Sequence, residues 1–223
     1  MKSVSVVVNA RLGSSRVQNK LLRDFAGTSL LEIALKKLDC LDFFEHRFLG
    51  VAEQELKDKA DSLNNVEILD RDMASVKPGV NPQSVTFAHY LRVPSDYVFV
   101  LNPCQPMLTT KTIKNAFDYF QNSSFISYTA GHQTRDWVFD NEGKALTNTN
   151  PDNLTTNKGA FFYKACHSFH IINKEILRET GNHWVFEKND PHLIEIPEEE
   201  AIDVDTPLDF SFAEYVYKQK TWD

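Results

Sequence analysis

Along the first half of the chain, short runs of β-branched residues alternate with helical patterns. The β-branched runs are typical of strands and occupy residues 4–9, 47–51, 66–69 and 97–101. Between them, apolar residues recur three and four positions apart, as on the buried face of a helix, in residues 29–38, 53–63 and 83–91. This alternation predicts an α/β fold with a parallel sheet joined by right-handed crossovers. Ligands bind such sheets beyond the carboxyl ends of the strands, so we expect the site in the loops after Asn9, Leu69 and Leu101.

The second half of the chain loses this regular alternation. Helical spacing returns in residues 110–121, 174–180 and 207–218, and further strands are expected at residues 125–129, 160–163 and 192–196. Residues 137–146 predict a β-hairpin, because two apolar arms flank a polar turn that contains Gly143. Residues 148–158 are rich in Thr, Asn, Pro and Asp without periodicity, which predicts a long loop.

Length and composition limit the classes of protein to which the chain can belong. Its 223 residues fit a single α/β domain, 1–223, with residues 132–158 as an extension within it. The formal net charge of -7 argues against a nucleic-acid-binding surface, which is normally basic. Three cysteines match neither a zinc site nor a disulfide framework, so we expect reduced thiols in a cytoplasmic protein. No apolar run is long enough to cross a bilayer, and we expect no membrane partner.

The loop after the first strand, residues 9–20, brings three cations and two serine hydroxyls together. Such a loop can offer backbone N–H groups to phosphate oxygens while its arginines and lysine neutralise charge, and Gly13 permits close approach. A solvent-facing connection is the alternative interpretation. The loop is not a P-loop, since Gly-x-x-x-x-Gly-Lys-Ser/Thr is absent, nor a dinucleotide fingerprint, since two glycines are missing. Its position after the first strand favours a nucleotide site.

Two carboxylates, Asp203 and Asp205, alternate along an extended segment just before the last helical pattern. Because side chains alternate along a strand, both are expected on one face, where they suit Mg²⁺. Thr206 is expected to cap the following helix, with Pro207 as its first residue. Helix capping is also the alternative role for the acids, since negative charge stabilises a helix N-terminus. Capping accounts for Asp209 more readily than for Asp203.

Both segments resemble motifs of the CMP-sugar synthetases, the cytidylyltransferases that activate sialic acid (acylneuraminate), KDO and related nonulosonic acids. Residues 10–20 are similar to the family's Ala-Arg-x-x-Ser-x-x-x-x-x-Lys loop, and residues 26–32 to its Gly-x-x-Leu-Leu helix start. Further matches are the strand that ends at Arg71, the turn 101–106, the segment 159–162 and the Ile-Asp-Val-Asp-Thr-Pro of residues 202–207. The resemblance implies a GT-A-like, three-layer Rossmann-like fold with a small β-hairpin dimerisation extension.

The resemblance also implies roles for individual residues. Arg11, Lys20 and Asp205 would be catalytic, and Asp203 and Asp205 would hold Mg²⁺. The residues implied to bind the nucleotide are Ala10, Arg11, Gly13, Ser14, Lys20, Arg71, Ser84 and Asn102. The implied reaction couples CTP to an acidic 2-keto sugar and releases pyrophosphate, as a step in surface polysaccharide or glycan synthesis. A homodimer paired through the hairpin extension is implied in the same way.

The chain departs from the family pattern at three places. Leu21 follows the loop lysine where the family has asparagine, Leu108 replaces an arginine, and Lys158 precedes Gly159 where the family has asparagine. These departures leave the identity of the sugar open, and they keep a catalytically silent nucleotide-binding relative as an alternative. A sugar-1-phosphate nucleotidyltransferase of another nucleotide specificity is a further alternative, although it predicts a Gly-x-Gly-x-Arg loop that this chain lacks.

Three other residues of chemically active types are assigned structural roles. His167 and His170 flank the apolar Phe169 near Cys166, so packing or surface roles are favoured over a metal site. Cys104 has no base beside it in the sequence, and we expect a small packed residue rather than a nucleophile.

Overall fold

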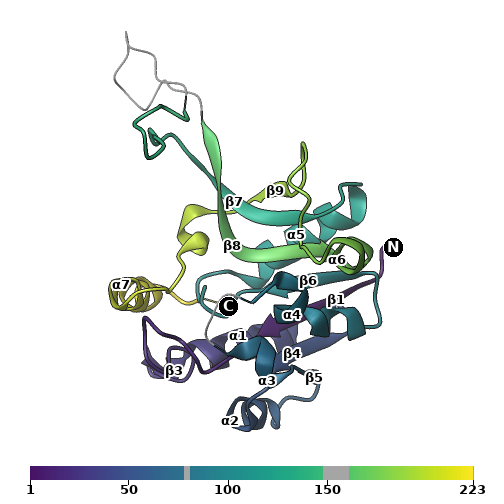
Figure 1. Ribbon diagram of the computed structural model, residues 1–223. Coiled ribbons are helices and arrows are strands. Elements are labelled where there is room, and N and C mark those ends of the chain that lie inside the picture. The colour runs from purple at the N-terminus through teal and green to yellow at the C-terminus, as the bar shows by residue number, and fades with distance from the viewer. Residues whose placement is uncertain (78–80, 148–160, 223) are drawn as a thin grey trace.

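The computed structural model describes residues 1–77, 81–147 and 161–222, and its centre is a seven-stranded sheet in the order β5-β4-β1-β6-β8-β7-β9 (Figure 1). β1 (Val4–Asn9) pairs in parallel with β4 (Arg47–Val51) and β6 (Tyr97–Leu101), and β4 pairs in parallel with β5 (Glu67–Asp70). β8 (Phe162–Asn173) is antiparallel to both β6 and β7 (Tyr128–Thr134), whereas β7 is parallel to β9 (His192–Glu195). Of these described strands, β8 alone runs in the opposite direction. The prediction of a mostly parallel sheet is therefore confirmed.

Helices cover both faces of this sheet. The longer ones are α1 (Leu30–Cys40), α5 (Thr110–Asn122), α6 (Lys174–Thr180) and α7 (Pro207–Tyr217), close to the predicted ranges. The two predicted helices at 53–63 and 83–91 are each broken into short pieces, namely α2 (Gln54–Lys57), η1 (Asp58–Ala60), α4 (Gln83–Thr86) and η2 (Ala88–Arg92). Few residues in these pieces are buried, and α4 buries none, so little packing energy favours a longer helix there. The remaining elements are α3 (Met73–Val76), η4 (Glu198–Ala201) and a small hairpin of β2 (Asp24–Phe25) and β3 (Thr28–Ser29).

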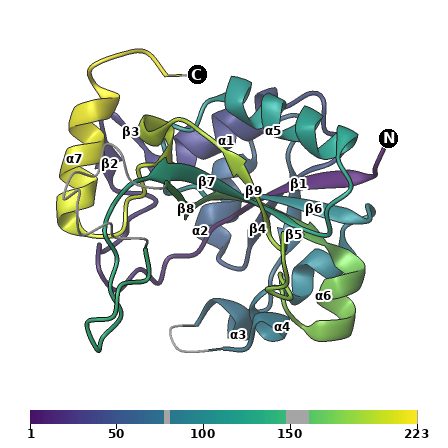
Figure 2. The same ribbon diagram turned by 90° about the horizontal axis from the view of Figure 1, so that it is seen from above.

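The alternation of side chains along the strands divides the interior into two layers. Val6 and Val8 of β1 pack with residues of α1, α5 and α7, whereas Val7 packs on the other face with residues of η2 and α6. Viewed from above, α1 and α5 lie on one side of the sheet, and α3, α4 and α6 lie on the other (Figure 2). The structure is thus the predicted three-layer α/β sandwich.

β7 and β8 extend beyond the rest of the sheet toward a projecting segment (Figure 1). Both are longer than predicted, because they pair with each other as far as Thr134 and Phe162. Residues 135–147, which we call the arm, contain the predicted hairpin as a narrow turn with a single bridge between Phe139 and Ala145. The predicted loop at 148–158 lies outside the described residues.

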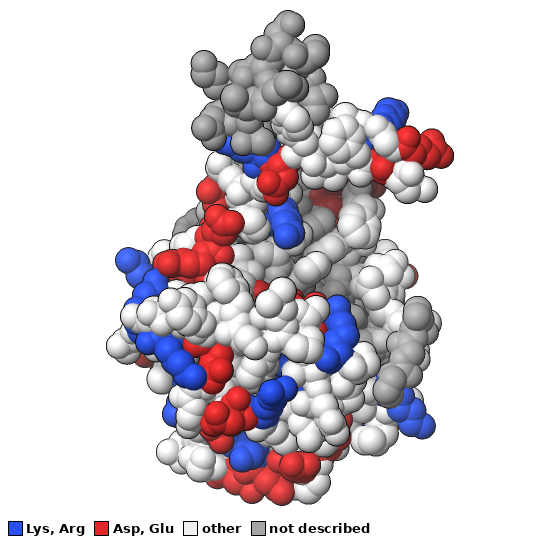
Figure 3. All heavy atoms as spheres, turned by 90° about the vertical axis from the view of Figure 1, so that its left-hand side faces the viewer, with Lys and Arg blue, Asp and Glu red and all other residues white. Residues whose placement is uncertain are grey.

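The surface carries charges of both signs. On the face shown in Figure 3, acidic and basic side chains are interspersed among uncharged ones, and the described residues there form no continuous basic patch. Among the described helices, none has both the length and the apolar character needed to cross a membrane.

Candidate active site

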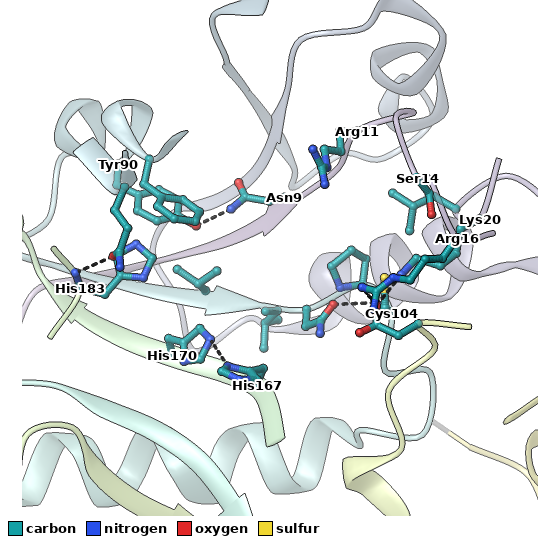
Figure 4. Close-up of a pocket in the computed structure, with 18 of the residues that line it drawn as sticks. Asn9, Arg11, Ser14, Arg16, Lys20, Tyr90, Cys104, His167, His170 and His183 are labelled. Carbon is teal, nitrogen blue, oxygen red and sulfur yellow. Dashed lines mark hydrogen bonds and ion pairs between the residues drawn. The ribbon is translucent and has the colours of Figure 1, made fainter. Parts of the chain in front are cut away.

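A cavity of about 580 Å³ opens at the carboxyl ends of β1 and β6. Its walls come from the loop after β1, the turn after β6, β8 and the segment after α6. The two ends of the cavity differ chemically (Figure 4). The cationic end comprises Arg11, Arg16, Lys20 and Asp205, and the aromatic end comprises Phe87, Tyr90, His170, His183, Trp184 and Phe186.

The loop of residues 10–20 is fixed at several points along its length. The Ala10 N–H donates to the Gly50 carbonyl of β4 at 3.0 Å, and the Leu12 N–H donates to Glu53 Oε1 at 2.9 Å. Val17 is buried, and Asn19 adopts a left-handed conformation with φ of 51°, which asparagine tolerates better than most residues. The loop therefore presents its cationic side chains from a defined backbone.

The backbone of this loop is less available for phosphate binding than the sequence suggested. The Ser14 N–H donates to the Leu12 carbonyl at 2.7 Å, and the Lys20 N–H donates to the Val17 carbonyl at 3.2 Å. Together with the Leu12 N–H, these groups are already bonded within the protein. These three N–H groups are therefore not available to a phosphate without breaking a bond within the protein.

Asp203 and Asp205 flank the buried Val204 in the extended segment before α7. The Val204 N–H donates to the Cys104 carbonyl at 2.9 Å, which holds this segment against the turn after β6. Asn102 Nδ2 donates to Asp203 Oδ1 at 3.4 Å, and Lys20 Nζ lies 3.3 Å from Asp205 Oδ1. Burial, with the added effect of the neighbouring Asp205 charge, raises the pKa of Asp203 to about 6. The two carboxylates are thus close enough for the charge of one to act on the other.

Two cations pair with one oxygen of Asp205. Arg16 Nη2 lies 3.1 Å from Asp205 Oδ1, and Lys20 Nζ lies 3.3 Å from the same atom. Lys20 also donates to the Val204 carbonyl at 2.6 Å. Burial alone would lower the pKa of Lys20, but Cys104, Asp205 and Asp203 together raise it, so Lys20 carries a full charge at neutral pH.

Cys104 lies beside Lys20 in the cavity wall. Burial raises the pKa of its thiol to about 11, which outweighs the opposing effect of the lysine charge. A protonated thiol is a poor nucleophile, in agreement with the packed role expected from the sequence.

The aromatic end is organised around Asn9, the last residue of β1. Asn9 Nδ2 donates to the hydroxyl of the buried Tyr90 (Figure 4). Asn9 Oδ1 lies 2.8 Å from His89 Nε2, which must therefore donate. Gly50 of β4 leaves room for this arrangement, because a Cβ atom there would overlap with Asn9 Oδ1. Burial lowers the pKa of His89 to about 3.

Two more histidines at this end are neutral at physiological pH. Burial lowers the pKa of His170 to about 3 and that of His183 to about 4. Thr129 Oγ1 lies 2.8 Å from His170 Nδ1, and the His183 N–H donates to Gln83 Oε1 at 3.0 Å. This end of the cavity therefore offers ring faces and neutral polar atoms.

The structure gathers part of the predicted nucleotide-binding and metal-binding residues around the cavity. Arg11, Ser14, Lys20, Asn102 and Asp205 line it. Asp203 lies immediately behind Asn102, to which it is hydrogen-bonded. Ala10 is buried in the core, and Gly13 is not part of the lining.

Arg71 and Ser84 lie outside the cavity lining. Arg71 is buried, and its Nη2 donates to the carbonyls of Ser75 at 3.5 Å and Thr86 at 3.3 Å. Its guanidinium thus joins α3 to α4 instead of facing the cavity. Ser84 is exposed on α4, and it is the adjacent Gln83 that reaches the lining.

The departures from the family pattern have visible structural consequences. Leu21 is buried and contributes an apolar surface to the cavity. Leu108 is also buried, in the hydrophobic core, a place where an arginine would need a charged partner. Lys158 lies outside the described residues.

Several lining residues were not predicted. Arg16 belongs to the loop motif, yet its pairing with Asp205 joins segments almost two hundred residues apart in the chain, and only the fold reveals it. The prediction of packing or surface roles for His167 and His170 is incomplete, since both line the cavity. His183 and Trp184 follow α6 without a recognisable motif.

The carboxylate pair fits a magnesium ion bound together with phosphate. No group of three or more His, Cys, Asp or Glu residues in the described part of the chain is arranged to enclose a metal. Magnesium commonly takes only one or two protein carboxylates and completes its shell with phosphate oxygens and water. Burial, and after it the neighbouring Asp205 charge, raises the pKa of Asp203, so a cation beside the pair would favour its ionised form.

Comparison with known proteins places this geometry in a family. The model of the cytidylyltransferase family matches residues 5–219. The chain belongs to the cytidylyltransferase family. It is therefore a nucleotidyltransferase, as the sequence predicted.

Individual relatives of this cytidylyltransferase are distant in sequence but cover nearly its whole length. It is 24% identical to post-translational flagellin modification protein B of Campylobacter coli, over 99% of this chain and 97% of that protein. A CMP-2-keto-3-deoxy-manno-octonic acid synthetase solved with CTP shares the fold, with a TM-score of 0.69, 14% identity, and coverage of 98% of this chain and 99% of the other. A 4-diphosphocytidyl-2C-methyl-D-erythritol synthase from Anaerococcus prevotii has a TM-score of 0.67 at 13% identity, with coverage of 98% and 99%. The fold is thus that of known cytidylyltransferases.

Proposed function

We propose that this cytidylyltransferase couples CTP to an acidic 2-keto sugar, a nonulosonic acid or KDO, giving a CMP-sugar and pyrophosphate for surface polysaccharide or glycan synthesis. The observation that carries the proposal is a single cavity with a cationic end beside a carboxylate pair and an aromatic end opposite. The name of one solved protein of the same fold, a CMP-2-keto-3-deoxy-manno-octonic acid synthetase, supports a keto-sugar-acid acceptor.

The cationic end suits the triphosphate of CTP. Nucleotidyl transfer requires little covalent work from the protein, and catalysis comes mainly from positioning and from stabilising the charge on the departing pyrophosphate. Arg11 and Lys20 would supply that stabilisation, and Ser14 and Asn102 would offer hydrogen bonds from the cavity wall. Asp203 and Asp205 would hold Mg²⁺, which when bound neutralises charge on the phosphates.

The aromatic end suits the acceptor. The rings of Phe87 and His183 have centroids 4.2 Å apart, and Trp184 packs against His170 at 5.2 Å. Such ring faces pack against the C–H surfaces of a sugar, and they exclude water from the attacking hydroxyl. The anomeric hydroxyl of the acceptor would then attack the α-phosphate of CTP in line with the leaving pyrophosphate.

Pyrophosphate release from CTP and Mg²⁺ tests the proposal with a panel of 2-keto sugar acids. We expect release with at least one member of the panel, and a loss on the order of a hundredfold in Lys20→Ala and Asp205→Asn, as for other preorganised charge stabilisers. Lys36→Ala, an exposed position on α1, serves as the matched control and should retain activity. Normal turnover in both site variants would refute these assignments.

The same assay separates the alternatives. CTP binding without turnover on any acceptor would favour a catalytically silent relative. Release only with a polyol phosphate, as in the methylerythritol enzyme of the same fold, would exclude a sugar acid. Preference for UTP or GTP in a thermal-shift screen would indicate a sugar-1-phosphate nucleotidyltransferase.

We also propose a homodimer in which the arm contacts a second copy. Val138, Phe139 and Leu146 are 44%, 52% and 62% exposed in this projecting segment (Figure 1). A narrow turn with one bridge cannot bury its own apolar side chains. An apolar surface of this kind is typical of a protein–protein contact.

A further inference from the structure

Asp205 Oδ1 accepts two cations, and these cations are held in different ways. Lys20 is 12% exposed, and its ammonium group is also bonded to the Val204 carbonyl at 2.6 Å. Arg16 is 62% exposed, and in the described part of the chain its guanidinium pairs with Asp205 at 3.1 Å. In Figure 4 the two side chains lie together at the same end of the cavity. Lys20 is therefore held in place by two bonds, whereas Arg16 is held by a solvent-exposed ion pair with Asp205.

An exposed ion pair of this kind is easily exchanged. Ion pairs between solvent-exposed side chains contribute little to the free energy of folding. Water and salt screen the attraction, and holding a long side chain in one place costs entropy. A divalent cation has twice the charge of a guanidinium and competes for the same carboxylate oxygen. Lys20 cannot leave without losing its bond to the Val204 carbonyl, so Arg16 is the cation that a metal would displace.

We propose that Arg16 occupies Asp205 in the ligand-free protein and is displaced from it onto the triphosphate when a divalent cation binds the Asp203–Asp205 pair. This inference rests on the proposed function, since it requires the metal and the nucleotide to share the cationic end. Arg16 lines the same cavity as Arg11 and Ser14, so the displaced guanidinium remains within the phosphate site. It then acts as a third phosphate-binding cation, and metal binding prepares the site for the triphosphate.

The first measurement is the affinity of the nucleotide-free protein for Mn²⁺. Electron paramagnetic resonance detects the free ion during the titration. Arg16→Gln leaves Asp205 without its exchangeable partner, so we expect Mn²⁺ to bind about two- to fivefold more tightly than in the unmodified protein. Arg11→Gln is the matched control, because it removes one positive charge from the same cavity without vacating Asp205. Its Mn²⁺ affinity should stay close to that of the unmodified protein.

The second measurement is the affinity for CTP with Mg²⁺ present, by calorimetry. Here Arg16→Gln should bind about tenfold more weakly, because a charged contact to phosphate is lost. The opposite signs of the two effects are the signature of exchange. A residue with only a structural role would weaken both affinities or neither.

The outcomes separate this inference from the proposed function. Equal Mn²⁺ affinity in Arg16→Gln and the unmodified protein would overturn the exchange, and so would weaker binding of both ligands. Unchanged Mn²⁺ binding in Asp205→Asn would overturn the metal site and the exchange with it. Pyrophosphate release in the acceptor panel, measured separately, reports on the proposed reaction in either case.

Discussion

Three histidines around the aromatic end remain neutral because they are buried. The pKa values of His89 and His170 are lowered to about 3, and that of His183 to about 4. An unfolded histidine takes up a proton below about pH 6.5, so acid favours the unfolded chain. The protein is therefore expected to tolerate neutral pH better than mild acid.

The first prediction is a loss of stability as pH falls from about 6.5 toward 4, by up to about 1.4 kcal/mol per pH unit for each histidine. The sign follows because these three histidines bind fewer protons in the folded state than in the unfolded chain, whereas Asp203, with its pKa raised to about 6, opposes them as a single group. Urea unfolding at about pH 7.5 and about pH 5 gives the free energy of unfolding at each pH, and the difference between them tests the prediction. His183→Phe, which keeps a ring in the same place, should reduce the difference. Equal stability at both pH values would contradict the neutral state of these residues.

The cysteines supply a second prediction. Cys104 has a pKa raised to about 11 by burial, and Cys166 is buried, whereas Cys40 is exposed at the end of α1. The thiolate is the nucleophile that displaces iodide from iodoacetamide, so this reagent at mildly alkaline pH should label Cys40 first. Peptide mapping by mass spectrometry identifies the labelled site, and Cys40→Ser should remove the fast phase. Faster labelling of Cys104 would show that its environment differs from the one described.

At the scale of elements, the start of α7 fixes the backbone of Asp205, one of the two proposed metal ligands. Thr206 caps the helix by accepting from the Asp209 N–H at 3.2 Å, and Asp209 Oδ2 accepts in return from the N–H groups of Thr206 at 2.7 Å and Asp205 at 3.2 Å. The capping box therefore includes the backbone of Asp205 itself. The same few bonds therefore set the start of the helix and the position of the Asp205 backbone.

Thr206→Ala should cost about 1 kcal/mol of stability, the usual effect of losing an N-cap side chain. Because the same bonds orient Asp205, the variant should also weaken Mn²⁺ binding, whereas Thr206→Ser, which keeps the hydroxyl, should change neither. Urea unfolding and the Mn²⁺ titration give the two values. A loss of stability with unchanged metal affinity would separate the cap from the site.

The sequence predicted those elements whose signals are local. β1, β4 and β6 are dense in β-branched or aromatic residues, and their bounds were predicted correctly. The cationic end was also predictable, since Arg11, Ser14 and Lys20 belong to one loop. Most of β8 was missed, because its length depends on pairing with β7, about forty residues earlier. The aromatic end could not be predicted, since Tyr90, His170 and His183 come from separate segments that only the fold brings together.

At the scale of the whole molecule, the exposed apolar side chains of the arm lead us to expect a homodimer. If a second copy covers Phe139 and Leu146, the double variant Phe139→Lys and Leu146→Lys should shift the protein from dimer to monomer in size-exclusion chromatography with light scattering. Met73→Lys, at an exposed apolar position on α3, is the control and should leave the dimer intact. A monomer in the unmodified protein would contradict the proposal outright.

The pairing of Thr134 with Phe162 has a consequence for how such a protein can diverge. The chain leaves β7 and enters β8 at neighbouring points, so for the sheet everything between them is the loop of one hairpin, whatever its length. Insertions, deletions or wholesale replacement there leave the register of both strands unchanged. New contacts can therefore arise by changes within this one insertion, while the residues that line the cavity stay as they are.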